Sequence, residues 1–271
     1  MTTNAKNPNG VIGESTSFLS VYRASLDGVI YAGGYGKPKR QMTDVAANYR
    51  KIIDRISEAA AKCGRNAREI RLLAAAKTQT VEAIGAAVDA GVRLIGENYV
   101  QEAKSKREEV SRQVEWHMVG HLQRNKAKTS VGLFDVIETL DNTTLARELD
   151  KEGRKQNIRV RALIEVNLGG EASKSGTTKN KVSELLKAVG ELSYVSIEGL
   201  MTIPPASEDC EEARPYFREL RELRDELQGL RLPNVDLKEL SMGMTHDYPI
   251  AIEEGATIVR IGTALFGPRR T

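Results

Sequence analysis

The chain has 271 residues, of which 40% are hydrophobic, 28% charged and 5% aromatic, the ordinary balance of a globular protein. Its 40 basic and 37 acidic side chains are spread along the whole chain, so we expect no nucleic-acid partner. The two cysteines, Cys63 and Cys210, have no zinc-ligand spacing, and no apolar run approaches the roughly 18 residues of a membrane span. These features predict a cytoplasmic protein with no bound metal and no membrane partner.

The sequence changes character near residue 42. Residues 1–41 are rich in Gly, Ser, Asn and Tyr without sustained periodicity, which predicts a flexible N-terminal tail. From Val45 to Ala59 apolar residues recur at helical spacing behind Thr43, a candidate N-cap. We therefore expect one folded domain, residues 42–271, that begins with an extra helix.

Strand-like and helix-like segments then alternate to the end of the domain. The predicted strands are Ile70–Ala76, Val92–Ile95, Glu115–Val119, Phe134–Thr139, Val160–Asn167, Val195–Met201, Leu237–Ser241 and Thr257–Ile261. The predicted helices are Val81–Ala90, Tyr99–Val110, Arg124–Val131, Thr143–Gln156, Lys179–Leu192, Cys210–Gln228 and Tyr248–Glu254. Eight strands with intervening helices predict an α/β fold, a single closed (β/α)8 barrel of the TIM type.

An open, doubly wound sheet is the alternative fold. Such sheets usually carry a glycine-rich turn after the first strand, whereas Lys77-Thr78-Gln79 stands there in this chain. The barrel is therefore favoured. Its active site is expected at the carboxyl ends of the strands, so the polar residues that follow each strand are the candidates for function.

Lys77 follows an apolar strand and is expected to reach the mouth of the barrel. Desolvation there favours the neutral amine, the nucleophile that Schiff-base chemistry with an aldehyde requires. The alternative is an ordinary strand-end lysine that reaches solvent. Position alone leaves both interpretations open.

Glycine turns follow the last two predicted strands. The segments are Ser241-Met242-Gly243-Met244-Thr245 and Arg260-Ile261-Gly262-Thr263. Glycines let backbone N–H groups approach an anion, and barrels recurrently bind phosphate at these two loops. Each turn by itself is also consistent with a plain tight turn. Together with Lys77 they favour a phosphorylated aldehyde, and Arg260 has the strand parity to face its phosphate or a ring nitrogen.

Two histidines, His117 and His121, lie near the end of the third predicted strand. No third metal ligand stands nearby in the sequence, so we expect His117 to line the pocket without a metal. His246 stands beside Asp247, and adjacent residues point in different directions, so a capping or solvent role is expected for it. Asn98 and Met201 fall at strand ends, where they would pack against a cofactor ring or belong to plain loops.

The chain resembles the pyridoxal phosphate homeostasis protein family, which is related to the N-terminal barrel of alanine racemase. The resemblance spans about residues 43 to 270 and rests on eight motifs in order. They are Ala76-Lys77-Thr78, Gly96-Glu97-Asn98-Tyr99-Val100-Gln101-Glu102, Trp116-His117, Leu122-Gln123-Arg124-Asn125-Lys126, Ser173-Lys174-Ser175-Gly176, Gly199-Leu200-Met201, and the two glycine segments around Gly243 and Gly262, the second running on to Gly267.

The resemblance implies that Lys77 holds pyridoxal 5'-phosphate as a Schiff base. It implies phosphate contacts from Ser241, Gly262 and Thr263, with Gly243 and Met244 in the same loop. It also implies ring-side contacts, which would come from Asn98, His117, Met201 and Arg260. The chain departs from the family where Thr245-His246 replaces the usual Ser-Asp, although a hydroxyl survives at Thr245.

The function that the resemblance implies is a non-catalytic carrier or buffer of pyridoxal phosphate in vitamin B6 homeostasis, expected as a monomer that supplies apo enzymes. An amino-acid racemase is the alternative. It needs a base on each face of its substrate, and the sequence shows one. A third alternative is an interaction protein that reuses the barrel without any cofactor, since fold does not fix function.

Overall fold

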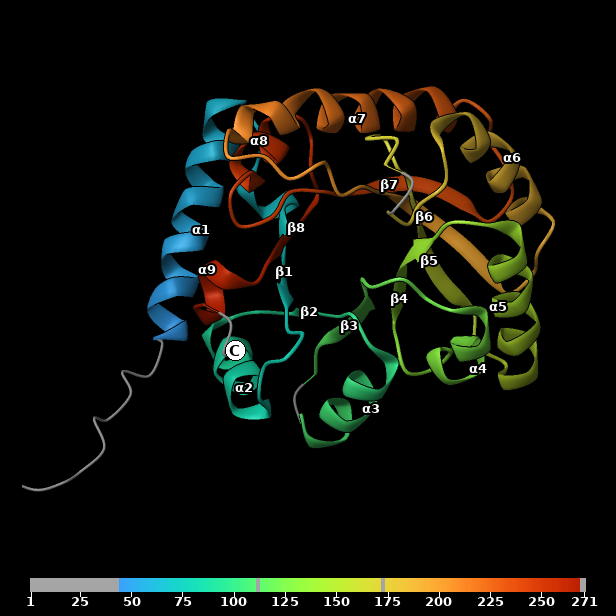
Figure 1. The fold of residues 1–271 in the computed structure, drawn as a ribbon, viewed down its shortest axis with the longest axis horizontal. Coiled ribbons are helices and arrows are strands. Elements are labelled where there is room, and N and C mark those ends of the chain that lie inside the picture. The colour runs from blue at the N-terminus through green and yellow to red at the C-terminus, as the bar shows by residue number, and fades with distance from the viewer. Residues whose placement is uncertain (1–43, 111–112, 172–173, 269–271) are drawn as a thin grey trace, which may run out of the picture. The chain divides into compact units, whose positions relative to one another are not determined.

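The computed structural model describes residues 44–110, 113–171 and 174–268. Eight parallel strands close into a barrel in chain order, and helices cover its outside (Figure 1). The predicted barrel is therefore confirmed. The strands are β1 Arg71–Ala75, β2 Leu94–Glu97, β3 Glu115–Met118, β4 Val136–Leu140, β5 Val160–Glu165, β6 Val195–Met201, β7 Val235–Ser241 and β8 Ile258–Ile261. The predicted tail, residues 1–41, and Ser173 lie outside the described residues.

The helices alternate with the strands. They are α1 Val45–Lys62, α2 Val81–Ala90, α3 Val100–Glu109, α4 Ala127–Ser130, α5 Thr143–Gln156, α6 Lys179–Gly190, α7 Arg214–Gln228, α8 Tyr248–Glu253 and α9 Thr263–Phe266. Short 3₁₀ turns stand at η1 Ala67–Glu69, η2 Arg124–Lys126 and η3 Cys210–Ala213. The four-residue helix α9, which follows β8, was not among the predicted helices.

Burial on both faces explains why β1 is a nearly continuous apolar run. In β1, Leu72, Leu73 and Ala74 are all buried, because one face of a barrel strand meets the helices and the other fills the interior. The first and last strands close the ring, and Leu73 pairs with Arg260. Lys77, just after β1, and Arg260, in β8, are therefore neighbours although they lie far apart in the sequence.

The extra helix α1 packs beside α2, α8 and α9 (Figure 1). Its buried stripe, Val45, Ile52, Ile56 and Ala59, follows the predicted helical spacing. The cap differs from the prediction, because the side chain of Asp44 accepts from the Ala47 N–H at 2.9 Å. A hydrogen bond from the Asn48 side-chain amide to the Leu265 carbonyl, at 3.0 Å, links α1 to α9. The extra helix thus supports the loop that follows β8.

Several predicted boundaries were wrong by a few residues, and two of them have a clear physical reason. The strand expected over Val92–Ile95 runs over Leu94–Glu97 instead, because Gly96 is a paired strand residue and not a terminator. A Cβ at Gly96 would lie 2.3 Å from the Leu73 side chain, so glycine there permits close packing inside the barrel. The helix expected from Cys210 begins as a 3₁₀ turn, and α7 starts at Arg214 with a proline in its first turn.

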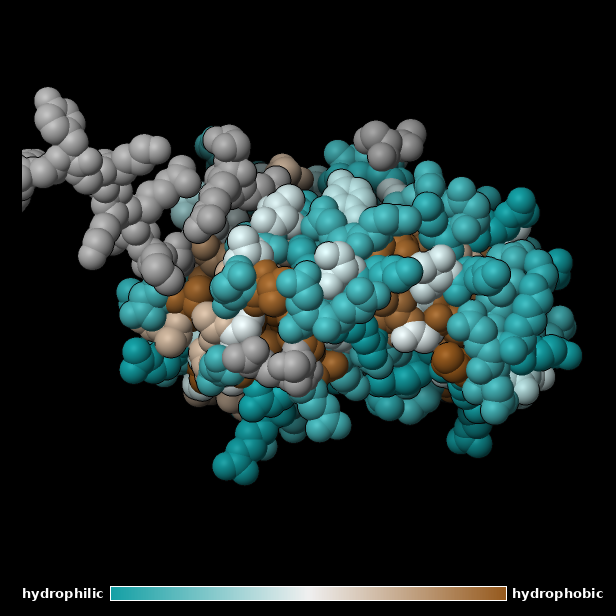
Figure 2. Space-filling view, turned by 90° about the horizontal axis from the view of Figure 1, so that it is seen from below, coloured by the Kyte–Doolittle hydropathy of each residue, from teal (hydrophilic) through white to brown (hydrophobic). Residues whose placement is uncertain are grey.

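The surface is mainly hydrophilic. On the face drawn in Figure 2, hydrophobic residues show only in patches between polar ones. Among the described residues, none of the helices combines the length and apolar character needed to cross a bilayer. The large apolar side chains that remain exposed include Ile203 and Met244, which lie at the mouth of the barrel.

Candidate functional site

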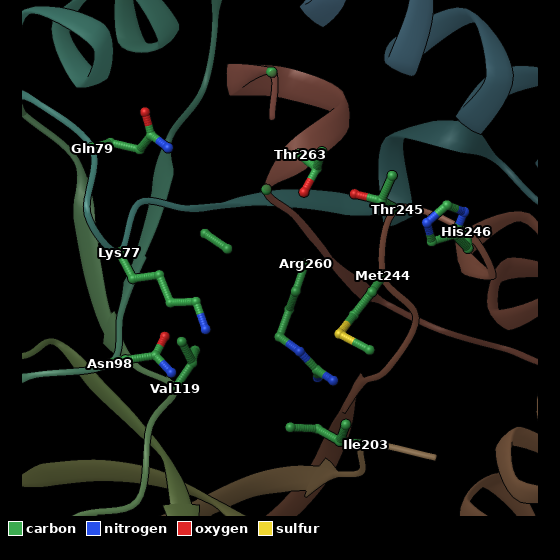
Figure 3. A pocket seen from close by; sticks show the side chains of 13 residues that line it. Lys77, Gln79, Asn98, Val119, Ile203, Met244, Thr245, His246, Arg260 and Thr263 are labelled. Atoms are coloured by element: carbon green, nitrogen blue, oxygen red, sulfur yellow. The ribbon is translucent and has the colours of Figure 1, made fainter. Parts of the chain in front are cut away.

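A cavity of about 300 Å³ opens at the carboxyl ends of the strands (Figure 3). This size is at the lower end of the range for small-molecule sites, roughly 300–1,000 Å³. Residues from the ends of β1, β2, β3, β6, β7 and β8 line it. They are Ala75, Lys77, Gln79, Asn98, Val119, Ile203, Met244, Thr245, His246, Arg260, Gly262, Thr263 and Gly267.

The cavity is electropositive. Lys77 and Arg260 both extend toward its middle, with Asn98 beside the lysine (Figure 3). No aspartate or glutamate is among the described residues that line it. Hydroxyl groups of Thr245 and Thr263 stand on the side away from Lys77. The arrangement suits an anion that also presents a group for an amine to attack.

Arg260 is held by a buried chain of hydrogen bonds. Its guanidinium donates to the Ser241 hydroxyl at 2.8 Å and to the Thr202 carbonyl at 2.8 Å. The Ser241 hydroxyl donates in turn to Glu138 at 2.6 Å, and the other Glu138 oxygen lies 2.6 Å from His117 Nδ1. Each of these side chains is at most 5% exposed, so the chain runs through the closed interior of the barrel.

Charges along this series of hydrogen bonds compensate one another. Burial alone raises the pKa of Glu138, but His117, Arg260 and the Ser241 hydroxyl outweigh it and hold the pKa below its usual value. Burial likewise opposes the charged form of His117, yet the nearby Glu115 carboxylate, 3.7 Å from Nε2, and the hydrogen bond to Glu138 raise its pKa. The ionised Glu138 therefore balances the positive charge of Arg260 beneath the cavity.

The two glycine loops differ in how strictly they require glycine. Gly243 has φ +89°, and a Cβ there would lie 2.6 Å from the Ala251 Cβ. The loops are joined where the Ala264 N–H donates to the Thr245 hydroxyl at 3.4 Å. The Gly262 backbone lines the cavity with room for a Cβ, whose first contacts would be at 3.6 Å from Ala75.

The structure brings together most of the predicted site residues. The residues that line the cavity are Lys77, Asn98, Met244, Arg260, Gly262 and Thr263. Those that lie behind it are His117, Met201, Ser241 and Gly243, all buried. His117, which we expected to line the pocket, is not among the lining residues of the cavity; it is buried and lies 2.6 Å from Glu138 inside the barrel. Ser241 reaches the cavity only through Arg260.

Sequence reasoning missed several lining residues. His246, expected to have a capping or solvent role, is exposed at the rim of the cavity. Gln79, Val119 and Ile203 also line it, each within four residues after a strand. The signal that could have found them is their position just after a barrel strand, which holds for apolar residues as well as for those with reactive side chains. His117 and His121 lie apart, and no three potential metal ligands gather within the described ranges.

The chain was compared with known protein families and curated proteins. The model of the alanine racemase N-terminal domain matches residues 46–270. A pyridoxal phosphate homeostasis protein of Aquifex aeolicus is 48% identical over 221 residues, which cover 81% of this chain and 96% of that protein. The Escherichia coli protein of the same name is 41% identical over 235 residues, 84% of this chain and 98% of that protein.

Solved structures show the same barrel. PipY of Synechococcus elongatus, determined with pyridoxal phosphate bound, has a TM-score of 0.69 at 36% identity, covering 78% of this chain and 100% of PipY. An unknown protein from Bifidobacterium adolescentis has a TM-score of 0.79 at 37% identity, covering 82% and 94% of the two chains. An alanine racemase of Clostridium difficile, at 13% identity and a TM-score of 0.65, covers 83% of this chain and 58% of its own, and shows a shared fold alone.

Proposed function

Because this chain belongs to the pyridoxal phosphate homeostasis protein family, we propose that it binds pyridoxal 5'-phosphate as a Schiff base on Lys77. The observation that carries the proposal is the cavity itself. It presents one amine and one guanidinium, and no carboxylate among its described lining residues. Such a site matches a cofactor that has both a phosphate and an aldehyde.

The residues present fit this cofactor. Backbone around Gly262 and Gly243, with the Thr263 and Thr245 hydroxyls, offers donors for a phosphate. Met244 lies in the same loop, and Ser241 would act through Arg260. Asn98 and Arg260 would contact the ring, with Met201 and His117 packed behind them. When bound, the cofactor supplies an aldehyde that condenses with the Lys77 amine.

Arg260 would set the electronic character of the ring. A guanidinium does not give up its proton, so a ring nitrogen that faces it remains unprotonated. This weakens the cofactor as an electron sink. The Glu138 carboxylate keeps Arg260 balanced and oriented for that contact. Weak electron withdrawal suits a protein that stores the cofactor more than one that uses it for carbanion chemistry.

The role that follows is a monomeric cytoplasmic carrier or buffer, which binds pyridoxal phosphate reversibly and releases it to apo enzymes. The relatives named for pyridoxal phosphate homeostasis support this role. An amino-acid racemase is the alternative, favoured by one observation. Besides Arg260, the titratable lining residues of the described chain are Lys77 and His246, and racemisation needs two acid–base groups.

Borohydride reduction tests the site. Reduction converts a Schiff base into a stable secondary amine, so peptide mass mapping of the cofactor-incubated protein should find a phosphopyridoxyl group on the Lys77 peptide. Lys77→Ala should remove the label, and Lys104→Ala, a change of an exposed lysine on α3, should keep it. A label on another lysine, or none, would refute the proposed attachment.

Proton exchange separates the carrier from the racemase. A racemase exchanges the α-proton of alanine in deuterated water, whereas a carrier leaves it in place. We expect no exchange above that caused by free pyridoxal phosphate at the same concentration. Exchange at enzymatic rates that disappears in His246→Ala would establish the racemase instead.

A further inference from the structure

Lys77 stands in a strained turn. The Ala76 carbonyl accepts from the Gln79 N–H at 3.0 Å, which closes a β-turn with Lys77 second and Thr78 third. Thr78 has φ +62°, in the left-handed region that favours glycine. A β-branched residue is a genuine outlier there, and such strain persists only where surrounding contacts hold it. Contacts from outside the turn must therefore hold it in this conformation.

One ion cluster holds both peptide groups that flank Lys77. The Lys106 ammonium donates to the Ala76 carbonyl at 3.0 Å, on the N-terminal side. The Glu102 carboxylate accepts from the Thr78 N–H at 3.1 Å, on the C-terminal side. Lys106 and Glu102 are themselves paired at 3.1 Å. The two bonds therefore form a single clamp around the lysine, built on α3.

The clamp is anchored in the barrel wall. Lys106 lies 2.7 Å from Glu97, at the end of β2, and the Glu97 side chain is fully buried. Its second oxygen, Oε2, has no hydrogen-bond partner among the residues that the structure describes. Burial raises the pKa of Glu97, against the pull of Lys106. A buried ion pair with an unpaired oxygen is a poor way to gain stability, so its placement points to the turn that it holds.

We propose that Glu102 and Lys106 are positioning residues for Lys77, which aim its amine into the cavity by fixing the peptide groups on either side. The inference rests on the proposed function, because it concerns the lysine that would hold the cofactor. It assigns to α3 a task separate from phosphate binding, which belongs to the loops after β7 and β8. The clamp should therefore matter only for ligands that bond to Lys77.

Two ligands separate these tasks. Pyridoxal 5'-phosphate carries the aldehyde, whereas pyridoxine 5'-phosphate keeps the ring and phosphate but has no carbonyl for Lys77 to attack. We expect Glu102→Ala to weaken the binding of pyridoxal 5'-phosphate about tenfold, which corresponds to the loss of one hydrogen bond to a charged group. The affinity of the Glu102→Ala variant for pyridoxine 5'-phosphate should stay within about twofold of that of the unmodified chain, a change well below the loss of one such bond. Lys77→Ala should show the same selectivity.

Matched variants control the test. Glu109→Ala removes an exposed carboxylate from the same helix and should leave both affinities unchanged. Glu102→Ala should also do less harm in a Thr78→Gly background, because glycine adopts positive φ without strain. Visible absorbance titrations measure the aldehyde ligand, and calorimetry measures the other.

Specific results would overturn the inference. Equal weakening of both ligands would mean that the cluster merely supports the cavity, and no weakening of either would mean that Lys77 needs no clamp. An equal loss with and without Thr78→Gly would break the link to the strained turn. If the unmodified chain bound neither ligand, the proposed function itself would fail. That outcome differs from the others, because no variant would then bind either ligand.

Discussion

Glu165, the last residue of β5, should make the protein less stable as pH rises. The residue is 6% exposed, and one carboxylate oxygen, Oε2, has no hydrogen-bond partner within the described part of the chain. Burial first, and then the nearby Asp141, raise its pKa from 4.5 to about 7, against the attraction of Arg260. In the unfolded chain the carboxyl ionises near its ordinary pKa, so folding then carries an electrostatic cost at neutral pH.

The size of the cost follows from the shift. Below pH 4.5 the carboxyl is protonated in both states and costs nothing. Between pH 4.5 and 7 the unfolded state ionises first, so stability falls by about 1.4 kcal/mol per pH unit. Above pH 7 the loss levels off at about 3 kcal/mol.

The substitution Glu165→Gln removes the titrating group and keeps the side-chain shape. Its free energy of unfolding, measured in urea from pH 4.5 to 8.5, should exceed that of the unmodified chain by an amount that grows up to pH 7 and then stays constant. Glu184→Gln, on an exposed position of α6, is the control and should show no such growth. A Glu165→Gln difference that is the same at every pH would refute the reasoning.

Two further predictions concern the loops and the buried chain. Gly243→Ala should cost more stability than Gly170→Ala in urea unfolding: both glycines have positive φ, worth about 1–3 kcal/mol of strain, but only at Gly243 would a Cβ clash. Equal costs would show that the β7 loop yields. Glu138→Leu should cost about 3–5 kcal/mol, since it removes the buried carboxylate that contacts His117 and holds Arg260 through Ser241. A loss below about 1 kcal/mol would mean that other groups balance Arg260.

The barrel was predictable because most of its strands are buried on both faces and so appear as short, mainly apolar runs between helices. The lysine and the glycine loops were predictable for a related reason. In a parallel barrel every strand ends at the same rim, so residues after β1, β7 and β8 must converge. The sequence therefore placed Lys77, Arg260 and Gly262 around one cavity without any measurement of distance.

Depth within the barrel was not predictable. Strand parity says that His117 faces inward, but only the register, in which it pairs with Val136, shows that it lies beneath the cavity. Glu138 and Glu165 went unnoticed because a carboxylate in an apolar strand is ordinarily read as facing solvent. The clamp on Lys77 also escaped notice, since it depends on Lys106 reaching from α3 to a carbonyl thirty residues earlier.

The pairing of β1 with β8 has a consequence for how the protein matures. Lys77 emerges from the ribosome about 180 residues before Arg260, an interval of roughly 10–40 s during synthesis. Until β8 has been made and has docked against β1, the growing chain has an amine but neither the guanidinium nor the last glycine loop. A nascent chain therefore has no complete cavity, and the aldehyde binding that we propose is deferred until the fold has closed.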